Sequence, residues 1–238
     1  MRVIIHQPEH MPWSGFFHKA NMADVYIALD NVQYRRRYFQ NRNKIRNKNG
    51  LLWITVPLKK NTRDELLIKD AKISRENLKW LKKNLESIFY CYSKSNFFEY
   101  IWNDLKYLYS KDYVYLSEFN ISLIKLFFQK LGLNKEIKLA STLTVSGNKS
   151  DLILNICAVV GAKTYVSGIS GKEYLNIKEF KRRGIKVVYQ EFHHPIYEQM
   201  HRPFIPCLSI IDILFNHGEN SLDIINGRGV PVMNEVFE

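Results

Sequence analysis

Cysteine is scarce in this chain of 238 residues, which contains three of them. Cys91, Cys157 and Cys207 are widely spaced and lie among apolar residues, and Cys157 in LILNICAVV resembles a core thiol rather than a nucleophile. An odd, scattered set provides neither a disulfide framework nor a CxxC metal-binding knuckle. The cysteine pattern therefore excludes a small secreted domain that depends on disulfides.

Long hydrophobic runs are also missing, because charged residues interrupt every apolar segment before it reaches transmembrane length. The opening MRVIIHQP has neither the apolar core nor the small-residue cleavage site of a signal peptide. Internal repeats and low-complexity linkers are absent as well. We therefore expect a cytoplasmic protein without a membrane span, folded as one domain over residues 1–238.

Acidic residues are few relative to basic ones, with 23 Asp and Glu against 35 Lys and Arg, and the formal net charge is +12. Such an excess favours polyanionic partners, namely nucleic acid, acidic lipid headgroups or nucleotide diphosphates. Many lysines, as in ENLKWLKKNLESIF, fall on the polar faces of predicted helices and serve solubility there. We give solubility the greater weight and keep nucleic acid as the alternative.

Apolar residues make up 46% of the chain and aromatic residues 13%, which fits a well-filled core. The apolar pattern predicts strands over residues 3–5, 25–29, 51–56, 137–143, 164–168 and 185–192, with a weaker one within 66–73. It predicts helices over residues 76–89, 97–108, 116–131, 149–160, 177–183 and 208–215. This order indicates an α/β fold, a Rossmann-like parallel sheet with a helical insert at about residues 74–132.

Polar residues follow the first predicted strand in HQPEHMPWSG. Side chains at such a strand-to-helix junction face the crevice in which α/β sheets bind ligands. His6 and His10 have metal-ligand spacing for a helix, but the prolines argue against a helix there, and we predict no metal site. Each histidine could hydrogen-bond a phosphate or carboxylate, act as an acid or base, or be structural. Gly15 allows an anion to approach the start of the next helix.

Asp30 ends the second predicted strand, where it could orient a ribose hydroxyl or an amine, or cap the next turn. The arginines of residues 35–37 cannot all face one way, and with the aromatic residues around them they resemble a surface on which bases stack. Asn41 and Arg42 offer planar groups suited to a sugar or a carboxylate.

SGISGKEY, residues 167–174, forms a second polar cluster at a predicted strand-to-helix turn. Successive small residues expose backbone N–H groups that can hold an anion, and Lys172 could neutralise a phosphate. The segment matches neither a Walker motif nor the dinucleotide-binding GxGxxG motif, so an ordinary loop is an equal alternative.

Together these motifs resemble the WbqC-like family of bacterial proteins. The resemblance is carried by HQPEHMPWSGFF, ADVYIALDNVQYRRRYFQNRNKI, LLWITVPL, YVSGISGKEYL and HPIYEQMHRPFIPCLSIIDILFNHG, which span nearly the whole chain. Members typically begin QPxxLPWxGYF and continue D-VQYxKRxWxNRNRI. The chain departs from this pattern at Met11 and at Phe39, where Trp is common.

The family is tied to gene clusters for O-antigen and other surface polysaccharides. The resemblance therefore implies a transferase or ATP-dependent ligase that forms an amide on a nucleotide-linked amino sugar, using an amino acid such as glycine or another acyl donor. Two alternatives stay open. One is a nucleic-acid-binding module, including a transferase that takes its aminoacyl group from tRNA, and the other is a non-catalytic scaffold.

The chain is also similar to nucleotidylyltransferase-like folds such as pantothenate synthetase, where a histidine loop and a Ser/Lys loop hold the phosphates of ATP. On that likeness His6 and His10 would stabilise a transferred phosphate, and Lys172 would clamp it. The second histidine of that motif falls here on Trp13 or Gly15. ATP with Mg²⁺ and a preformed acyl donor therefore remain alternatives.

The candidate site residues form three groups. The catalytic candidates are His6, His10 and Asp30. The substrate-binding candidates are Gln7, Trp13, Gln33, Tyr34, Arg37, Asn41, Arg42, Tyr174, His193 and His201. The phosphate-binding candidates are Gly15, Ser167, Gly168, Ser170, Gly171 and Lys172.

Overall fold

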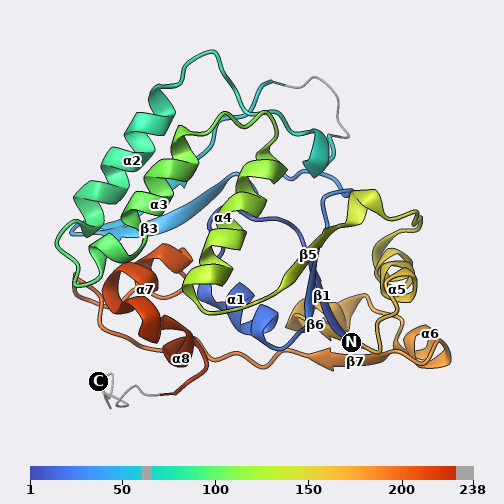
Figure 1. Cartoon of the computed structure of the whole chain (residues 1–238). Helices are drawn as coiled ribbons and strands as arrows, with labels where there is room; N and C mark the ends of the chain where they lie inside the picture. The colour runs from blue at the N-terminus through green and yellow to red at the C-terminus, as the bar shows by residue number, and fades with distance from the viewer. Residues whose placement is uncertain (61–65, 229–238) are drawn as a thin grey trace.

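A five-stranded parallel sheet organises the chain, for which a computed structural model describes residues 1–60 and 66–228. Its strands are β1 (Arg2–His6), β2 (Val25–Ala28), β5 (Glu136–Leu139), β6 (Thr164–Ser167) and β7 (Lys186–Tyr189), as Figure 1 shows. They lie in the order β5-β2-β1-β6-β7, and every neighbouring pair is parallel. This confirms the predicted α/β, Rossmann-like fold.

Each face of the sheet is covered by its own layer of helices because side chains along a strand alternate between the two faces. Ile4, Tyr26 and Val166 belong to a core shared with α1 (Ser14–Asn21), α4 (Leu116–Lys130) and α7 (Ile210–His217). Val3 and Ile27 belong to a second core, shared with α5 (Lys149–Val159) and α6 (Ile177–Arg182). The near-continuous apolar runs of the strands thus fit a sheet buried on both faces.

A separate antiparallel hairpin contains the strand predicted over 51–56. β3 (Arg42–Asn47) pairs with β4 (Gly50–Thr55), and Gly50 turns the chain with φ +126°. The Asn49-Gly50 turn was predicted, but β3 before it was not. The weaker strand expected within 66–73 is wrong, because residues 68–70 form the short 3₁₀ turn η1 (Ile68–Asp70) with isolated bridges on either side.

Three α-helices lie between β4 and β5 in the described part of the chain: α2 (Lys79–Tyr92), α3 (Phe98–Ser110) and α4. The predicted helices match them, although α2 begins and ends three residues later than expected. Tyr92 and Phe98 stack on Phe215 of α7, with ring centroids 4.8 and 5.5 Å apart. These helices therefore share a core with the end of the chain. The insert boundaries at 74–132 stay a prediction.

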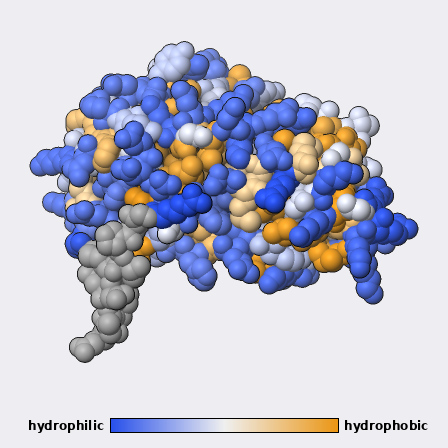
Figure 2. Space-filling model, turned by 60° about the horizontal axis from the view of Figure 1, so that its bottom comes forward, coloured by the Kyte–Doolittle hydropathy of each residue, from blue (hydrophilic) through white to orange (hydrophobic). Residues whose placement is uncertain are grey.

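The remaining elements are short. They are η2 (Ala140–Thr142), η3 (Ile169–Glu173), η4 (Gly218–Asn220) and α8 (Ser221–Ile225). Gly132 and Gly161 end α4 and α5 with φ of +66° and +70°, as their places in the sequence predict. On the face shown in Figure 2, hydrophobic residues lie in several patches separated by hydrophilic ones rather than in one continuous apolar surface.

Candidate functional site

A cleft of about 560 Å³ lies at the carboxyl ends of β1, β6 and β7. The chain leaves β1 toward β2 on one side, whereas β6 returns on the other side, so the strand order reverses between β1 and β6. Ligands of open α/β sheets bind at such a switch point, and the volume suits a small organic molecule. The lining residues are His6, Trp13, Gly15, Phe16, Lys19, Gly168, Ile169, Ser170, Gln190, Glu191, Phe192 and His193.

The N-terminal loop and the 167–174 loop both contribute to this one cleft. His6 ends β1, Gly168 follows β6, and Gln190 follows β7. Three segments far apart in the sequence therefore meet because their strands are neighbours in the sheet. Six residues proposed from the sequence are brought together in this way. They are His6, Trp13, Gly15, Gly168, Ser170 and His193.

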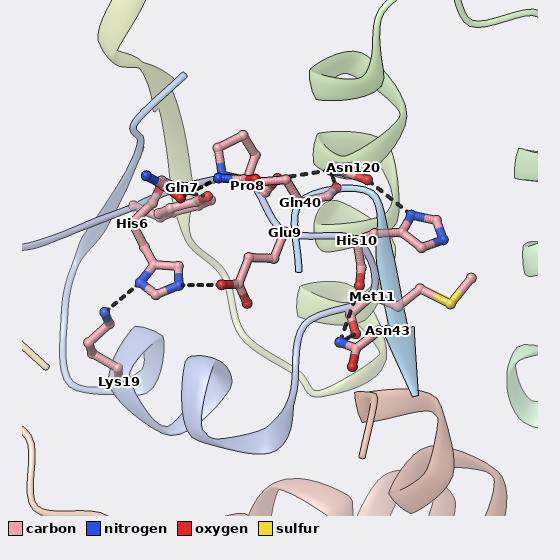
Figure 3. Close-up of polar contacts among 11 residues, drawn as sticks. His6, Gln7, Pro8, Glu9, His10, Met11, Lys19, Gln40, Asn43 and Asn120 are labelled. Carbon is pink, nitrogen blue, oxygen red and sulfur yellow. Dashed lines mark hydrogen bonds and ion pairs between the residues drawn. The ribbon is translucent and has the colours of Figure 1, made fainter. Parts of the chain in front are cut away.

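A chain of three ionisable side chains runs along the cleft wall. Nζ of Lys19 lies 2.9 Å from Nδ1 of His6, and Nε2 of His6 lies 3.4 Å from Oε1 of Glu9. Figure 3 shows the imidazole between the other two groups. Lys19 and Glu9 are 5% and 6% exposed. Burying charged groups is costly, and the contacts among these three side chains offset only part of that cost, since Nε2 of His6 makes no well-aligned hydrogen bond.

The contacts fix the protonation states. A lysine ammonium can only donate, so Nδ1 of His6 accepts from it and the imidazole proton lies on Nε2, toward Glu9. Burial, followed by the charge of Lys19, lowers the pKa of His6, which favours the neutral ring. Burial also lowers the pKa of Lys19 from 10.5 to about 8, against the opposing effect of Glu9. Lys19 therefore titrates close to physiological pH.

Buried amides hold the loop that follows His6. Asn120 of α4 accepts from Nδ1 of His10 at 3.0 Å and donates to the carbonyl of Pro8 at 2.8 Å. Asn43 of β3 donates to the carbonyl of Met11 at 2.7 Å, where the backbone has φ +46°. Figure 3 shows both amides against this loop. The polar residues of the opening motif thus serve first to fix its path.

Trp13 forms one wall of the cleft. Its ring packs edge-on against Phe192 at 5.4 Å and lies nearly parallel to His194 at 6.4 Å. A side chain on Gly15 could not fit beside it, since a Cβ there would lie 2.4 Å from the indole. The position of the Trp13 ring therefore requires a glycine at residue 15, which also lines the cleft.

His10, one of the catalytic candidates, lies away from the cleft. The side chain is completely buried, bonded to Asn120 and packed against Phe119 at 5.5 Å. Burial lowers the pKa of His10 to about 4, so the ring is neutral. No atom of His10 lines the cleft. These contacts fit the structural interpretation of the sequence, and a catalytic role for His10 stays a prediction.

Asp30, another catalytic candidate, also lies away from the cleft, and its catalytic role stays a prediction. Its carboxylate is 2% exposed and accepts from the backbone N–H and the hydroxyl of Ser141, at 2.8 and 2.6 Å. Ser141 belongs to η2, at the end of β5. The aspartate therefore caps a turn that lies 111 residues later in the chain, not the turn that directly follows it. It does not line the cleft.

The other proposed residues lie outside the cleft lining. They are Gln7, Gln33, Tyr34, Arg37, Asn41, Arg42, Ser167, Gly171, Lys172, Tyr174 and His201. Gln7 accepts from Gln40 at 2.7 Å, and Asn41 donates to the carbonyl of Val56 at 2.8 Å. Nζ of Lys172 lies 5.4 Å above the Tyr189 ring. The phosphate clamp expected of Lys172 and the roles of the other residues in binding stay predictions.

Two important residues were not proposed from the sequence, Lys19 and Glu9. A signal for Lys19 was present, because it lies three residues after Phe16 and thus on the apolar face of a short helix. A charged residue at such a position needs a partner. Glu9 gave no comparable signal, since it lies in a loop whose path depends on Asn120 and Asn43.

Within residues 1–60 and 66–228, no group of three or more His, Cys, Asp or Glu side chains is arranged to hold a metal ion. Among these same residues, no helix has the length and apolarity needed to cross a bilayer.

The fold and the site define a class, that of Rossmann-like α/β proteins with a cleft at the switch point of the sheet. The chain belongs to the WbqC-like protein family, whose model matches residues 7–224. It is 29% identical over 226 residues to the uncharacterized protein Rv1507c of Mycobacterium tuberculosis, an alignment that covers 94% of this chain and 97% of that protein. No solved structure matches the chain.

Proposed function

We propose that this protein is an enzyme that forms an amide on a nucleotide-linked amino sugar, with an amino acid or another acyl group as donor. The observation that supports it most is the Lys19–His6–Glu9 chain at the wall of the switch-point cleft. Membership of the WbqC-like family supports the sugar substrate, through the surface-polysaccharide clusters in which such proteins are encoded.

Amide formation requires a base, because the attacking amine loses a proton as its nitrogen bonds to the acyl carbon. A base works best when its pKa is near the working pH. Lys19, with a pKa of about 8, meets this condition. In the proposed reaction neutral Lys19 takes the proton from the amine, and the C–N bond forms while the bond to the leaving group breaks. The proton then passes to the leaving group.

His6 and Glu9 position the base in this scheme. The imidazole keeps Nζ of Lys19 at a fixed place on the wall, and the Glu9 carboxylate fixes the ring tautomer. The backbone of residues 168–170, which lies at the same cleft, would hold the diphosphate of the substrate through its N–H groups. The acyl donor is either preformed or made from a free amino acid that is activated with ATP and Mg²⁺; the second route is the alternative.

The test combines binding with product detection. The purified protein is incubated with dTDP- and UDP-linked amino sugars and with glycine, with or without ATP and Mg²⁺. Melting temperature reports binding, because a ligand of the native state raises it, and mass spectrometry reports an acylated sugar. Lys19→Met should reduce turnover roughly 10²- to 10⁴-fold, whereas Lys178→Met, at an exposed position of α6, should not.

Wild-type turnover should also rise with pH up to about 8, as Lys19 loses its proton. A folded Lys19→Met protein that retains full turnover would exclude this base. Failure of every nucleotide sugar to raise the melting temperature would count against the proposed substrate.

A further inference from the structure

Positive charge is concentrated in one short segment of the chain. Residues 31–60 contain nine Lys or Arg and no Asp or Glu, while the formal net charge of the whole chain is +12. Surfaces that serve only solubility mix both signs of charge. A segment with one sign alone indicates a polyanionic partner.

The β3–β4 hairpin displays part of this charge on one face. Arg42, Lys44 and Trp53 share a face because Lys44 pairs with Trp53, and Arg42 is two residues before Lys44. The opposite face, with Ile45 and Ile54, is buried in the core. The outer face therefore meets solvent around Arg42, Lys44 and Trp53, whereas Arg46 on the same face is buried and donates to the carbonyls of residues 202 and 203.

Trp53 lies exposed among these cations. Its side chain is 39% exposed, and the Arg42 guanidinium lies 4.2 Å and the Lys44 ammonium 5.3 Å from the indole centroid. The guanidinium lies over the ring and holds it in place, so cationic and aromatic groups are presented together on this face.

Two further aromatic rings continue the surface. Phe39 lies 6.1 Å from Trp53, and Tyr38 lies 5.4 Å from Phe39 and is 43% exposed. Residues 35–37 next to them are exposed arginines. Three neighbouring aromatic rings, with two cations over one of them, match the way proteins bind an unpaired nucleic acid strand, by stacking on bases and pairing with phosphates.

We propose that this surface, formed by Tyr38, Phe39, Arg42, Lys44 and Trp53, binds single-stranded RNA. Unstacked bases are needed because a duplex does not offer its base faces to a ring. The surface is distinct from the switch-point cleft, since none of its five residues lines that cleft. The inference therefore stands whether or not the protein forms amides.

The test measures binding of a fluorescein-labelled 12-nucleotide RNA of mixed sequence by anisotropy at several salt concentrations. Trp53→Ala should weaken binding roughly 5- to 150-fold, the loss of one stacked base. Lys44→Gln should reduce the slope of log affinity against log salt by about 0.7, the loss of one phosphate contact. Tryptophan fluorescence should fall when RNA binds.

Tyr107→Ala is the matched control. Tyr107 is 61% exposed on α3 with the Lys111 ammonium 4.4 Å from its ring, but it lies outside the basic segment. Its loss should leave RNA affinity unchanged. If Trp53→Ala does not fold, Trp53→Phe takes its place and should keep most of the affinity while the quenching is lost.

Unchanged affinity in Trp53→Ala would overturn the proposal. The proposal would also be overturned if a 12-base-pair duplex or heparin bound as tightly as the RNA and none of these ligands quenched the tryptophan fluorescence. Positive charge alone would then account for the binding. Binding that fails equally in Tyr107→Ala would also overturn it.

Discussion

Replacing Lys19 by Met removes a charge that the fold buries at a cost. The pKa of Lys19 falls from 10.5 to about 8 in the folded protein, mainly through burial. Each unit of such a shift corresponds to about 1.4 kcal/mol. The folded state therefore loses about 3 kcal/mol by keeping this ammonium protonated.

The sign of the pH dependence follows from where the proton is held. Below pH 8 the lysine is protonated in both folded and unfolded chains, so the full cost is present. Between pH 8 and 10.5 the unfolded chain keeps the proton that the folded chain has lost, and the free energy of unfolding rises with pH. Above 10.5 both states are neutral and the cost has disappeared.

The assay is urea unfolding of the wild type and Lys19→Met at half-unit steps from pH 7 to 10.5, followed by circular dichroism. The difference between the two proteins should change by about 3 kcal/mol across this range in favour of the wild type. Lys125→Met, at an exposed position of α4, controls for loss of a surface lysine and should follow the wild type. If the curves of wild type and Lys19→Met run parallel, the argument from burial is wrong.

Three other substitutions test the remaining contacts. Gly15→Ala should displace the Trp13 ring and lower the free energy of unfolding by about 1–3 kcal/mol. The tryptophan emission should shift as the ring moves, and an unchanged emission spectrum would contradict this displacement. Asp30→Ala should cost about 3 kcal/mol in urea unfolding by leaving the Ser141 donors unpaired, yet leave ligand affinity at the cleft unchanged. His10→Ala should cost about 2–4 kcal/mol, again with cleft affinity unchanged in calorimetry, and a selective loss of affinity would restore it to the site.

Much of the fold could be predicted because its signals are local. Buried parallel strands appear as apolar runs, and α4 appears as an apolar stripe ended by Gly132. The position of the cleft also follows from the order of elements along the chain, because side chains at the junction between a parallel strand and the next helix face the crevice of the sheet. Strand β3, which was not predicted, alternates charged residues with Asn or Ile in RNKIRN. It has a single apolar residue, so the apolar pattern did not reveal it.

The roles of single residues could not be predicted, because they depend on distant partners. His10 and Asp30 become structural through Asn120 and Ser141, 110 and 111 residues away. Nothing near either residue in the chain reveals such a partner. The Lys19 contact spans only 13 residues, but it depends on the loop that Asn120 holds in place.

The central place of β1 in the sheet has a consequence for synthesis on the ribosome. β1 pairs with β2 within 25 residues, but its other neighbour, β6, begins only at Thr164. At about 5–20 residues per second, the nascent chain holds that edge of β1 unpaired for roughly 8–30 s. Until β6 is made, the free edge of this apolar strand can pair with strands other than β6. A chaperone that shields residues 2–6 during translation should therefore improve the yield of folded protein.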